Sequence, residues 1–274
     1  MKNISSKSSE FSPHKVASLA ADKIRELTGI EKHRLALVLG SGWGKSADQM
    51  GEIVSEIHAD QIPGFLHSRI PGHSGTLQSL ALPSGDFALI IGARTHLYEG
   101  YGVQQVVHPI RSAAAAGAEI MVLTNGAGGI KKKWKPGEPV LISDHINLTS
   151  SSPLEGATFI DLTDLYSRRL RDIAQSVDPS LDEGVYVQFR GPHYETPAEV
   201  QMAKTMGGHI VGMSTALEAI AAREAGMEVL GLSLITNLAA GISPHPLSHT
   251  EVIDAGKAAE PVISKLLADI VSKL

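Results

Sequence analysis

Short apolar runs that end at glycine or polar turns recur along this chain, and they limit the fold more than any other feature. They are Leu35 to Leu39, Phe87 to Ile91, Ile120 to Leu123, Val140 to Ile142, Val185 to Val187 and Val229 to Ile235. Such runs lack the alternation of apolar and polar residues that is typical of a strand with one solvent-exposed face. They therefore predict strands buried on both faces. A sheet of this kind needs helices on both sides.

Helical patterns lie between several of these runs. They cover Val103 to Ala116, Leu165 to Ala174, Pro197 to Met206, Ala216 to Ala225 and His249 to Val271. A further helix is expected from Ser12, a capping residue followed by proline, to a stop at Gly29. Thr76 to Leu82 and Phe87 to Ile91 flank a turn and predict a hairpin. The predicted fold class is α/β: a single-domain sandwich whose mixed, mostly parallel sheet is flanked by helices.

One domain, 1–274, is expected because no linker, internal repeat or shift in composition marks a boundary. Residues 1–12 are polar and Ser-rich, which predicts a flexible N-terminal tail. Hydrophobic residues make up 43% and charged residues 19% of the chain, and this composition excludes intrinsic disorder.

Charge and cysteine content exclude several functions. The net charge of -5 gives no general attraction to nucleic acid or to an anionic membrane. Because cysteine is absent, disulfides, thiolate zinc sites and cysteine nucleophiles are excluded together. No secretion signal and no run long enough for a membrane span occurs, so we expect a cytoplasmic protein.

The glycine-rich segment Gly40 to Ser46 follows the first apolar run directly. Its backbone N–H groups could receive an anion, for which phosphate is the natural candidate, although a plain tight turn explains the glycines equally well. The segment differs from the dinucleotide-binding fingerprint at one position, where Lys45 replaces the last glycine. It differs from the Walker A loop also at one position, where Leu39 replaces the first glycine. A P-loop nucleotide-binding module, which would bind ATP or GTP with magnesium, is one alternative function.

A polar cluster follows the next buried run, where alternation places Arg94, His96 and Tyr98 on one side. Arginine offers paired planar donors to a phosphate, histidine adds another donor, and tyrosine can bond a sugar hydroxyl. The structural alternative is an ion pair between Arg94 and Glu99 together with a core histidine.

Ser214 lies in Gly212-Met213-Ser214-Thr215-Ala216, which resembles the nucleophile elbow of hydrolases except for its final alanine. A serine hydrolase would need an acid and a histidine after this serine. The available residues are Glu218, Glu224, Glu228 and His249. The serine can equally bind phosphate or cap the following helix.

Three further polar segments stand at strand ends. Thr124 to Gly129 forms a flexible turn with exposed amides, while Glu195 beside the aromatic Tyr194 could read the N–H groups of a stacked planar base. Asn237 closes the last apolar run, where an amide can donate and accept at a base edge. No metal-binding spacing occurs.

Seven segments taken in order resemble the trimeric purine nucleoside phosphorylases over nearly the whole chain. They are Gly40-Ser41-Gly42, Pro71 to Gly75, Arg94 to Tyr101, Thr124 to Gly129, Gly191 to Glu199, Gly212 to Thr215 and Ile235-Thr236-Asn237. The resemblance implies a single-domain α/β fold, a homotrimer with active sites near subunit boundaries, and reversible phosphorolysis of purine ribosides and deoxyribosides. It implies no metal and no organic cofactor, with inorganic phosphate as co-substrate.

The resemblance also implies roles for individual residues. Phosphate would be bound by Ser41, His73, Arg94, His96, Ser214 and the backbone of Gly126; ribose by Tyr98, Met213, His249 and a Phe159 lent by the neighbouring subunit; and the purine by Tyr194, Glu195 and Asn237. Asn237, Glu195 and His96 would be the catalytic residues. Asn237 and Glu195 favour inosine and guanosine, because a sister group that cleaves methylthioadenosine has Asp in place of this Asn. A methylthioadenosine phosphorylase is the nearest alternative function.

Overall fold

A computed structural model describes residues 12–66, 75–243 and 246–274. Most of the expected N-terminal tail lies outside these residues, but Ser12 is described and caps the first helix. None of the helices in the described ranges is long and apolar enough to span a membrane.

The described residues form a nine-stranded sheet that closes on itself at one end. Its order is β2-β3-β4-β1-β5-β8-β7-β6-β9, with a further pairing of β5 and β9. The strands are β1 Leu35–Val38, β2 Glu52–His58, β3 Thr76–Ala81, β4 Phe87–Ile91, β5 Ile120–Gly129, β6 Pro139–Asn147, β7 Asp182–Gln188, β8 Ile210–Gly212 and β9 Glu228–Leu238. Strand β5 therefore belongs both to the open part of the sheet and to the closed part.

Strand directions are mixed, as the sequence predicted. The pairs β1–β4, β1–β5, β5–β9, β6–β7 and β7–β8 are parallel. The pairs β2–β3, β3–β4, β5–β8 and β6–β9 are antiparallel. The antiparallel β3–β4 pair is the hairpin expected from the turn between its strands.

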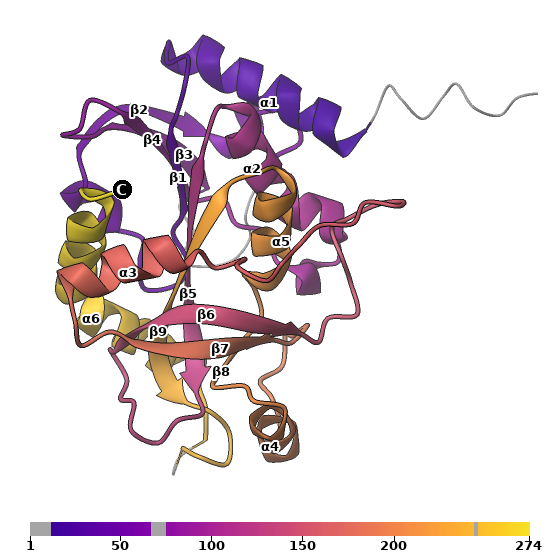
Figure 1. Cartoon of the computed structure of the whole chain (residues 1–274), viewed down its shortest axis with the longest axis vertical. Helices are drawn as coiled ribbons and strands as arrows, with labels where there is room; N and C mark the ends of the chain where they lie inside the picture. Colours follow the sequence, from indigo (N-terminus) through magenta and orange to yellow (C-terminus); the bar gives the residue numbers. More distant parts are fainter. Residues whose placement is uncertain (1–11, 67–74, 244–245) are drawn as a thin grey trace, which may run out of the picture.

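Helices cover both faces of the sheet (Figure 1). They are α1 Pro13–Thr28, α2 Val103–Ala115, α3 Arg168–Val177, α4 Pro197–Thr205, α5 Ala216–Glu224 and α6 His249–Val271. Within β1, Ala36 and Val38 pack in the core that α1, α2 and α5 share, whereas Leu35 and Leu37 pack in the core beneath α3 and α6. This alternation explains why the strand is apolar at every position.

The structure differs from the sequence predictions at several strands and at both ends of one helix. The segment Thr124 to Gly129 was predicted as a flexible turn, but it continues strand β5 and pairs with β9. Strand β2 gave no apolar run because most of its residues are exposed, and β8 has only 3 residues. Helix α3 begins at Arg168 rather than Leu165, since Tyr166 forms a bridge to Val229 and Ser167 caps the helix, and it ends at Val177 rather than Ala174. The remaining predicted helices match within one residue at each end.

Candidate active site

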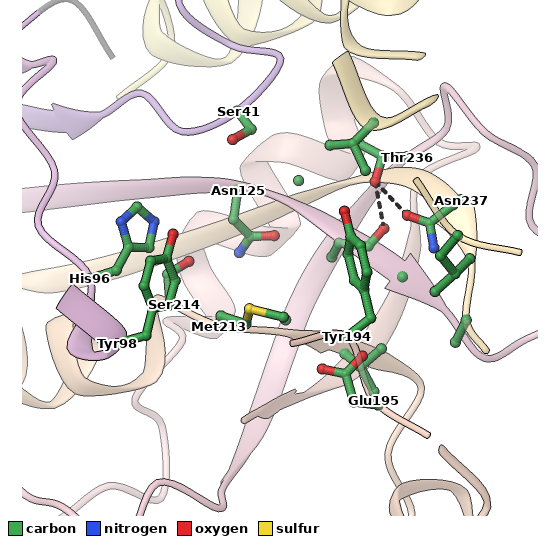
Figure 2. A pocket seen from close by; sticks show the side chains of 18 of the residues that line it. Ser41, His96, Tyr98, Asn125, Tyr194, Glu195, Met213, Ser214, Thr236 and Asn237 are labelled. Carbon is green, nitrogen blue, oxygen red and sulfur yellow. Dashed lines mark hydrogen bonds between the residues drawn. The ribbon is translucent and has the colours of Figure 1, made fainter. Parts of the chain in front are cut away.

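One cavity lies where β1, β4, β5, β8 and β9 end or continue into loops, and it gathers most of the residues singled out from the sequence (Figure 2). The predicted site residues that line it are Ser41, Arg94, His96, Tyr98, Gly126, Tyr194, Glu195, Met213, Ser214 and Asn237. These residues are far apart in the chain. The parallel strands β1, β4, β5 and β9 bring several of them together because their carboxyl ends meet at one edge of the sheet. Strand β8 runs antiparallel to β5 and brings the residues that follow it, Met213 and Ser214, to the same place.

Three predicted site residues are not placed in this cavity. His73 lies outside the described residues, and the side chain of His249 is also outside them, although its backbone begins α6. Phe159 does not line the cavity, and 92% of its surface is exposed on the loop between β6 and α3.

The turn after β1 passes very close to β5. A Cβ atom on Gly40 would lie 2.5 Å from the Thr124 carbonyl oxygen and 2.9 Å from Arg94 Nη1, so only glycine fits there. This close approach places Ser41 at the cavity. The P-loop alternative does not match the structure, because a 3₁₀-helix at Ser46–Gln49 follows the turn and Lys45 lies exposed beside Glu260, at 3.5 Å.

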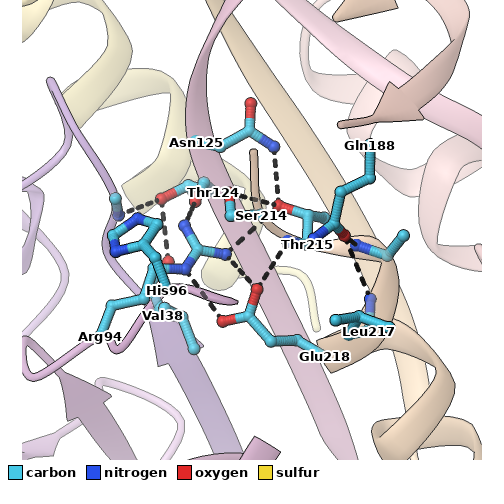
Figure 3. A network of polar contacts seen from close by, with 12 residues as sticks. Val38, Arg94, His96, Thr124, Asn125, Gln188, Ser214, Thr215, Leu217 and Glu218 are labelled. Atoms are coloured by element: carbon cyan, nitrogen blue, oxygen red, sulfur yellow. Dashed lines mark hydrogen bonds and ion pairs between the residues drawn. The ribbon is translucent and has the colours of Figure 1, made fainter. Parts of the chain in front are cut away.

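Arg94 is buried and forms a two-bond ion pair with Glu218 of α5 (Figure 3). Its Nε donates to Oε1 at 2.9 Å and its Nη2 donates to Oε2 at 2.7 Å. The pair with Glu99 that the sequence left open does not form. Glu99 instead accepts the backbone N–H of His96 at 2.6 Å.

The remaining Arg94 contacts limit what it can offer to an anion. Nη1 donates to the Thr124 carbonyl oxygen at 2.7 Å, and Nη2 also reaches Thr215 Oγ1 at 3.2 Å. Since a guanidinium carries five N–H groups, these contacts leave one Nη1–H for a ligand. Glu218 also offsets the positive charge, so neutral donors must supply much of the binding to an anion here.

His96 and Tyr98 stack beside this network, with ring centroids 4.8 Å apart and planes inclined by 16°. Burial raises the pKa of Tyr98 to about 12, so its phenol keeps its proton at neutral pH. A neutral phenol both donates and accepts, which suits it to a sugar hydroxyl.

The opposite side of the cavity carries Glu195, Tyr194 and Asn237. Glu195 is 6% exposed, and its Oε1 has no hydrogen-bond partner among the described residues. Burial raises the pKa of this carboxyl above its usual value. Asn237 accepts from Thr236 Oγ1 at 2.9 Å and donates one N–H to the Leu238 carbonyl at 3.0 Å, so its second N–H remains for a ligand.

The three glutamates that a serine hydrolase could have used are all engaged with arginines. Glu218 pairs with Arg94, and Glu224 accepts from Arg111 at 2.9 Å. Glu228 pairs with Arg169 and also accepts from Ser167 at 2.8 Å. None of these carboxylates is available to orient a histidine for Ser214, so the structure gives the hydrolase alternative no support.

Sequence reasoning did not single out Asn125, Thr215 or Thr236 as individual site residues. Asn125 and Thr236 line the cavity, and the Thr215 hydroxyl contacts both Arg94 and Asn125. Thr215 precedes a helix, where a threonine normally indicates only a cap. Its position next to Ser214 in the sequence is the only feature that could have indicated a role for Thr215.

The chain matches the family model described as Phosphorylase superfamily over residues 34–272. It belongs to this superfamily. A purine nucleoside phosphorylase of Cellulomonas sp is 60% identical over 265 residues, which cover 95% of this chain and 94% of the relative.

Two crystal structures of Schistosoma mansoni purine nucleoside phosphorylase are also similar. The adenosine complex has a TM-score of 0.86 at 34% identity, covering 95% of this chain and 97% of the other. The inosine complex has a TM-score of 0.85 at 32% identity, covering 95% and 96%. These likenesses confirm the single-domain α/β nucleoside phosphorylase fold expected from the sequence.

Proposed function

We propose that this protein catalyses the reversible phosphorolysis of purine ribonucleosides and deoxyribonucleosides of the inosine and guanosine class. The products are the free base and ribose or deoxyribose 1-phosphate. The observation that carries the proposal is a single cavity with anion donors on one side and Glu195 and Asn237 on the other. Close relatives named purine nucleoside phosphorylase support it over nearly the full chain.

The chemistry follows from where charge develops. A phosphate oxygen forms a bond to C1′ of the sugar while the bond from C1′ to N9 breaks. The electron pair of the broken C1′–N9 bond stays with the purine. Donors around Ser41, Ser214 and Arg94 would hold the phosphate in line with C1′. The nucleophile is then already in place, so the reaction needs no diffusive encounter. The remaining Asn237 N–H would donate to N7 of the departing base and so stabilise its negative charge.

Specificity for the 6-oxopurines would come from Glu195. Its unpartnered Oε1 can accept the N1–H of hypoxanthine or guanine, and adenine has no proton at N1. An adenosine complex of the Schistosoma mansoni relative shows that binding of adenosine occurs in that protein. We therefore propose that 6-oxopurine nucleosides are cleaved faster than adenosine, and not that adenosine fails to bind.

Assembly and cofactors are part of the same proposal. We propose a homotrimer in which Phe159 reaches the sugar site of a neighbouring subunit, because this aromatic ring is 92% exposed and lies outside its own chain's cavity. No metal and no organic cofactor is needed, and inorganic phosphate is the co-substrate. Within the described ranges, no cluster of three or more metal-ligating side chains occurs. We propose a cytoplasmic location, as expected from the sequence.

The test is a phosphate-dependent assay with inosine that follows hypoxanthine and ribose 1-phosphate. We expect both products only when phosphate is present. Release of hypoxanthine without phosphate would contradict the proposal and indicate a hydrolase. Faster cleavage of methylthioadenosine than of inosine would instead assign the chain to the sister group.

A further inference from the structure

Thr215 stands at the centre of the polar network on the anion side of the cavity (Figure 3). Its side chain is fully buried, and its hydroxyl contacts three groups from different parts of the chain. Arg94 Nη2 lies 3.2 Å away, Asn125 Nδ2 2.9 Å away, and Ser214 Oγ 3.3 Å away.

The first two contacts fix the direction of the third. A guanidinium and an amide NH₂ can only donate, so Thr215 Oγ1 accepts both of these hydrogen bonds. A hydroxyl has two acceptor positions and one proton. With both acceptor positions used, the Thr215 proton is left for Ser214 Oγ.

Ser214 consequently acts as an acceptor toward Thr215, which leaves its own proton to be donated elsewhere. The neighbouring Tyr186 hydroxyl already accepts the backbone N–H of Ser214 at 3.3 Å. The Ser214 side chain also bonds this phenol, so its proton can go to the Tyr186 oxygen or, because Ser214 lines the cavity, to an anion bound there. The serine is thus set as a donor before any anion arrives.

The same contact orients Asn125. Because its Nδ2 donates to Thr215, its Oδ1 is held on the other side of the amide, where it is buried without a partner among the described residues. In the view of Figure 2 this oxygen points toward the side of the pocket where Tyr194 and Thr236 lie. Asn125 therefore offers the bound reactants an acceptor.

The backbone at Thr215 shows that the arrangement has an energetic cost. Its φ of 84° lies in a region that favours glycine and is an outlier for a β-branched residue. Strain of this kind is maintained where surrounding contacts over-determine it. Here the Thr215 N–H donates to Glu218 Oε2 at 2.6 Å, and that glutamate is the partner of Arg94.

We propose that Thr215 is a positioning residue for phosphate, acting through Ser214: by accepting from Arg94 and Asn125 it directs its own proton to Ser214 and so fixes that serine as a donor to the anion. The inference rests on the proposed function for the identity of the anion as phosphate. Thr215 itself does not line the cavity.

The experiment measures the dissociation constant of inorganic phosphate by isothermal titration calorimetry, which needs no turnover. Thr215→Gly removes the hydroxyl but suits the positive φ, so we expect a folded protein whose phosphate affinity falls about tenfold. Thr215→Val should lose a similar factor, and Thr215→Ser, which keeps the hydroxyl, should stay within about threefold of the unsubstituted chain. Thr149→Val is the control, since it removes a buried threonine hydroxyl outside the cavity and should leave the affinity unchanged.

A double-mutant cycle shows whether Thr215 acts through Ser214. In a Ser214→Ala background, Thr215→Gly should weaken phosphate binding by less than about threefold, because the serine proton is already absent. Equal affinities of Thr215→Gly and the unsubstituted protein, fully multiplicative effects in the cycle, or an unsubstituted chain that does not bind phosphate would each overturn the inference. Phosphate binding that depends on Thr215 in a protein without inosine cleavage would refute the proposed reaction and leave the inference standing.

Discussion

The two sides of the cavity are built differently. On the anion side, Arg94, Thr215 and Glu218 bond to one another, and each is at most 3% exposed. On the purine side, Glu195 is nearly as deeply buried, yet one of its oxygens has no partner within the described residues. The anion side is organised before a ligand binds, whereas the purine side keeps an unfilled acceptor for the base.

This difference has a physical reason. Phosphate presents oxygens on all sides, so its donors need fixed directions, and the hydrogen bonds among Arg94, Thr215 and Glu218 supply them. A purine is recognised at a few edge atoms, where an unpaired acceptor rejects bases that lack the matching N–H. Such an acceptor costs stability until the ligand arrives.

The largest effect is expected on the anion side, for Glu218→Ala. Removing this carboxylate leaves the buried Arg94 charge without its partner, so the free energy of unfolding should fall by about 3 to 5 kcal/mol. Urea denaturation measures the loss. Asp172→Ala, which breaks the exposed pair with Arg168, should cost no more than about 1 kcal/mol. Equal losses in the two variants would show that the Arg94 pair is not special.

The next effect is expected at the departing base. Asn237→Asp removes the N–H that would donate to N7, so kcat/KM for inosine should fall by about 100-fold. Activity on 6-aminopurine nucleosides should fall less, because their exocyclic amine can donate to the new carboxylate. Steady-state kinetics with inosine and adenosine checks this, and an unchanged preference would count against the assigned role. The free energy of unfolding should fall less than in Glu218→Ala, since the loss within the protein is one hydrogen bond, from Asn237 to the Leu238 carbonyl.

The smallest effect is a pH dependence confined to the purine side. Burial raises the pKa of Glu195, so the carboxyl gains a proton at a higher pH than an exposed glutamate does. The ionised form accepts N1–H more strongly than the protonated form, and hypoxanthine affinity should therefore fall as the pH drops through this raised pKa, by up to about tenfold per pH unit. Calorimetric titration over a pH series measures it.

Glu195→Gln is the matched variant for that series. It should bind hypoxanthine more weakly at neutral pH, and its affinity should not fall further as the pH is lowered. The unliganded chain provides a second readout, because the unfolded carboxyl ionises first as the pH rises. Stability should therefore decline between the ordinary pKa and the raised pKa of Glu195, and the glutamine variant should not show this decline. If hypoxanthine affinity still falls at low pH in Glu195→Gln, a group other than Glu195 causes the pH dependence.

Features with a local cause could be predicted from the sequence. Ser12 and Gly29 bound α1 as expected, because a cap and a left-handed glycine act within one turn of the helix. The buried strands were found because both of their faces meet helices. His96 and Ser214 could be picked out because each lies in a short, recognisable polar segment after a strand, whereas Ser41 was identified through the resemblance to the phosphorylases.

Features that depend on distant residues could not be predicted. Arg94 and Glu218 are 124 positions apart, and nothing near Arg94 distinguishes this partner from the closer Glu99. The role of Thr215 depends on Asn125, which is 90 positions away. A strand such as β2, exposed along most of its length, lacks the continuous apolar run that marked the buried strands.

Strand β5 has a consequence for how this protein could move. It pairs with β1, whose following turn carries Ser41, and with β9, where Gly128 stands opposite Asn237. The groups assigned to the nucleophile and to the leaving base therefore stand on strands that share β5, although a register shift between Ala127 and Gly128 interrupts the β5–β9 pairing beside Asn237. A change in the spacing of these two groups would require the sheet itself to move.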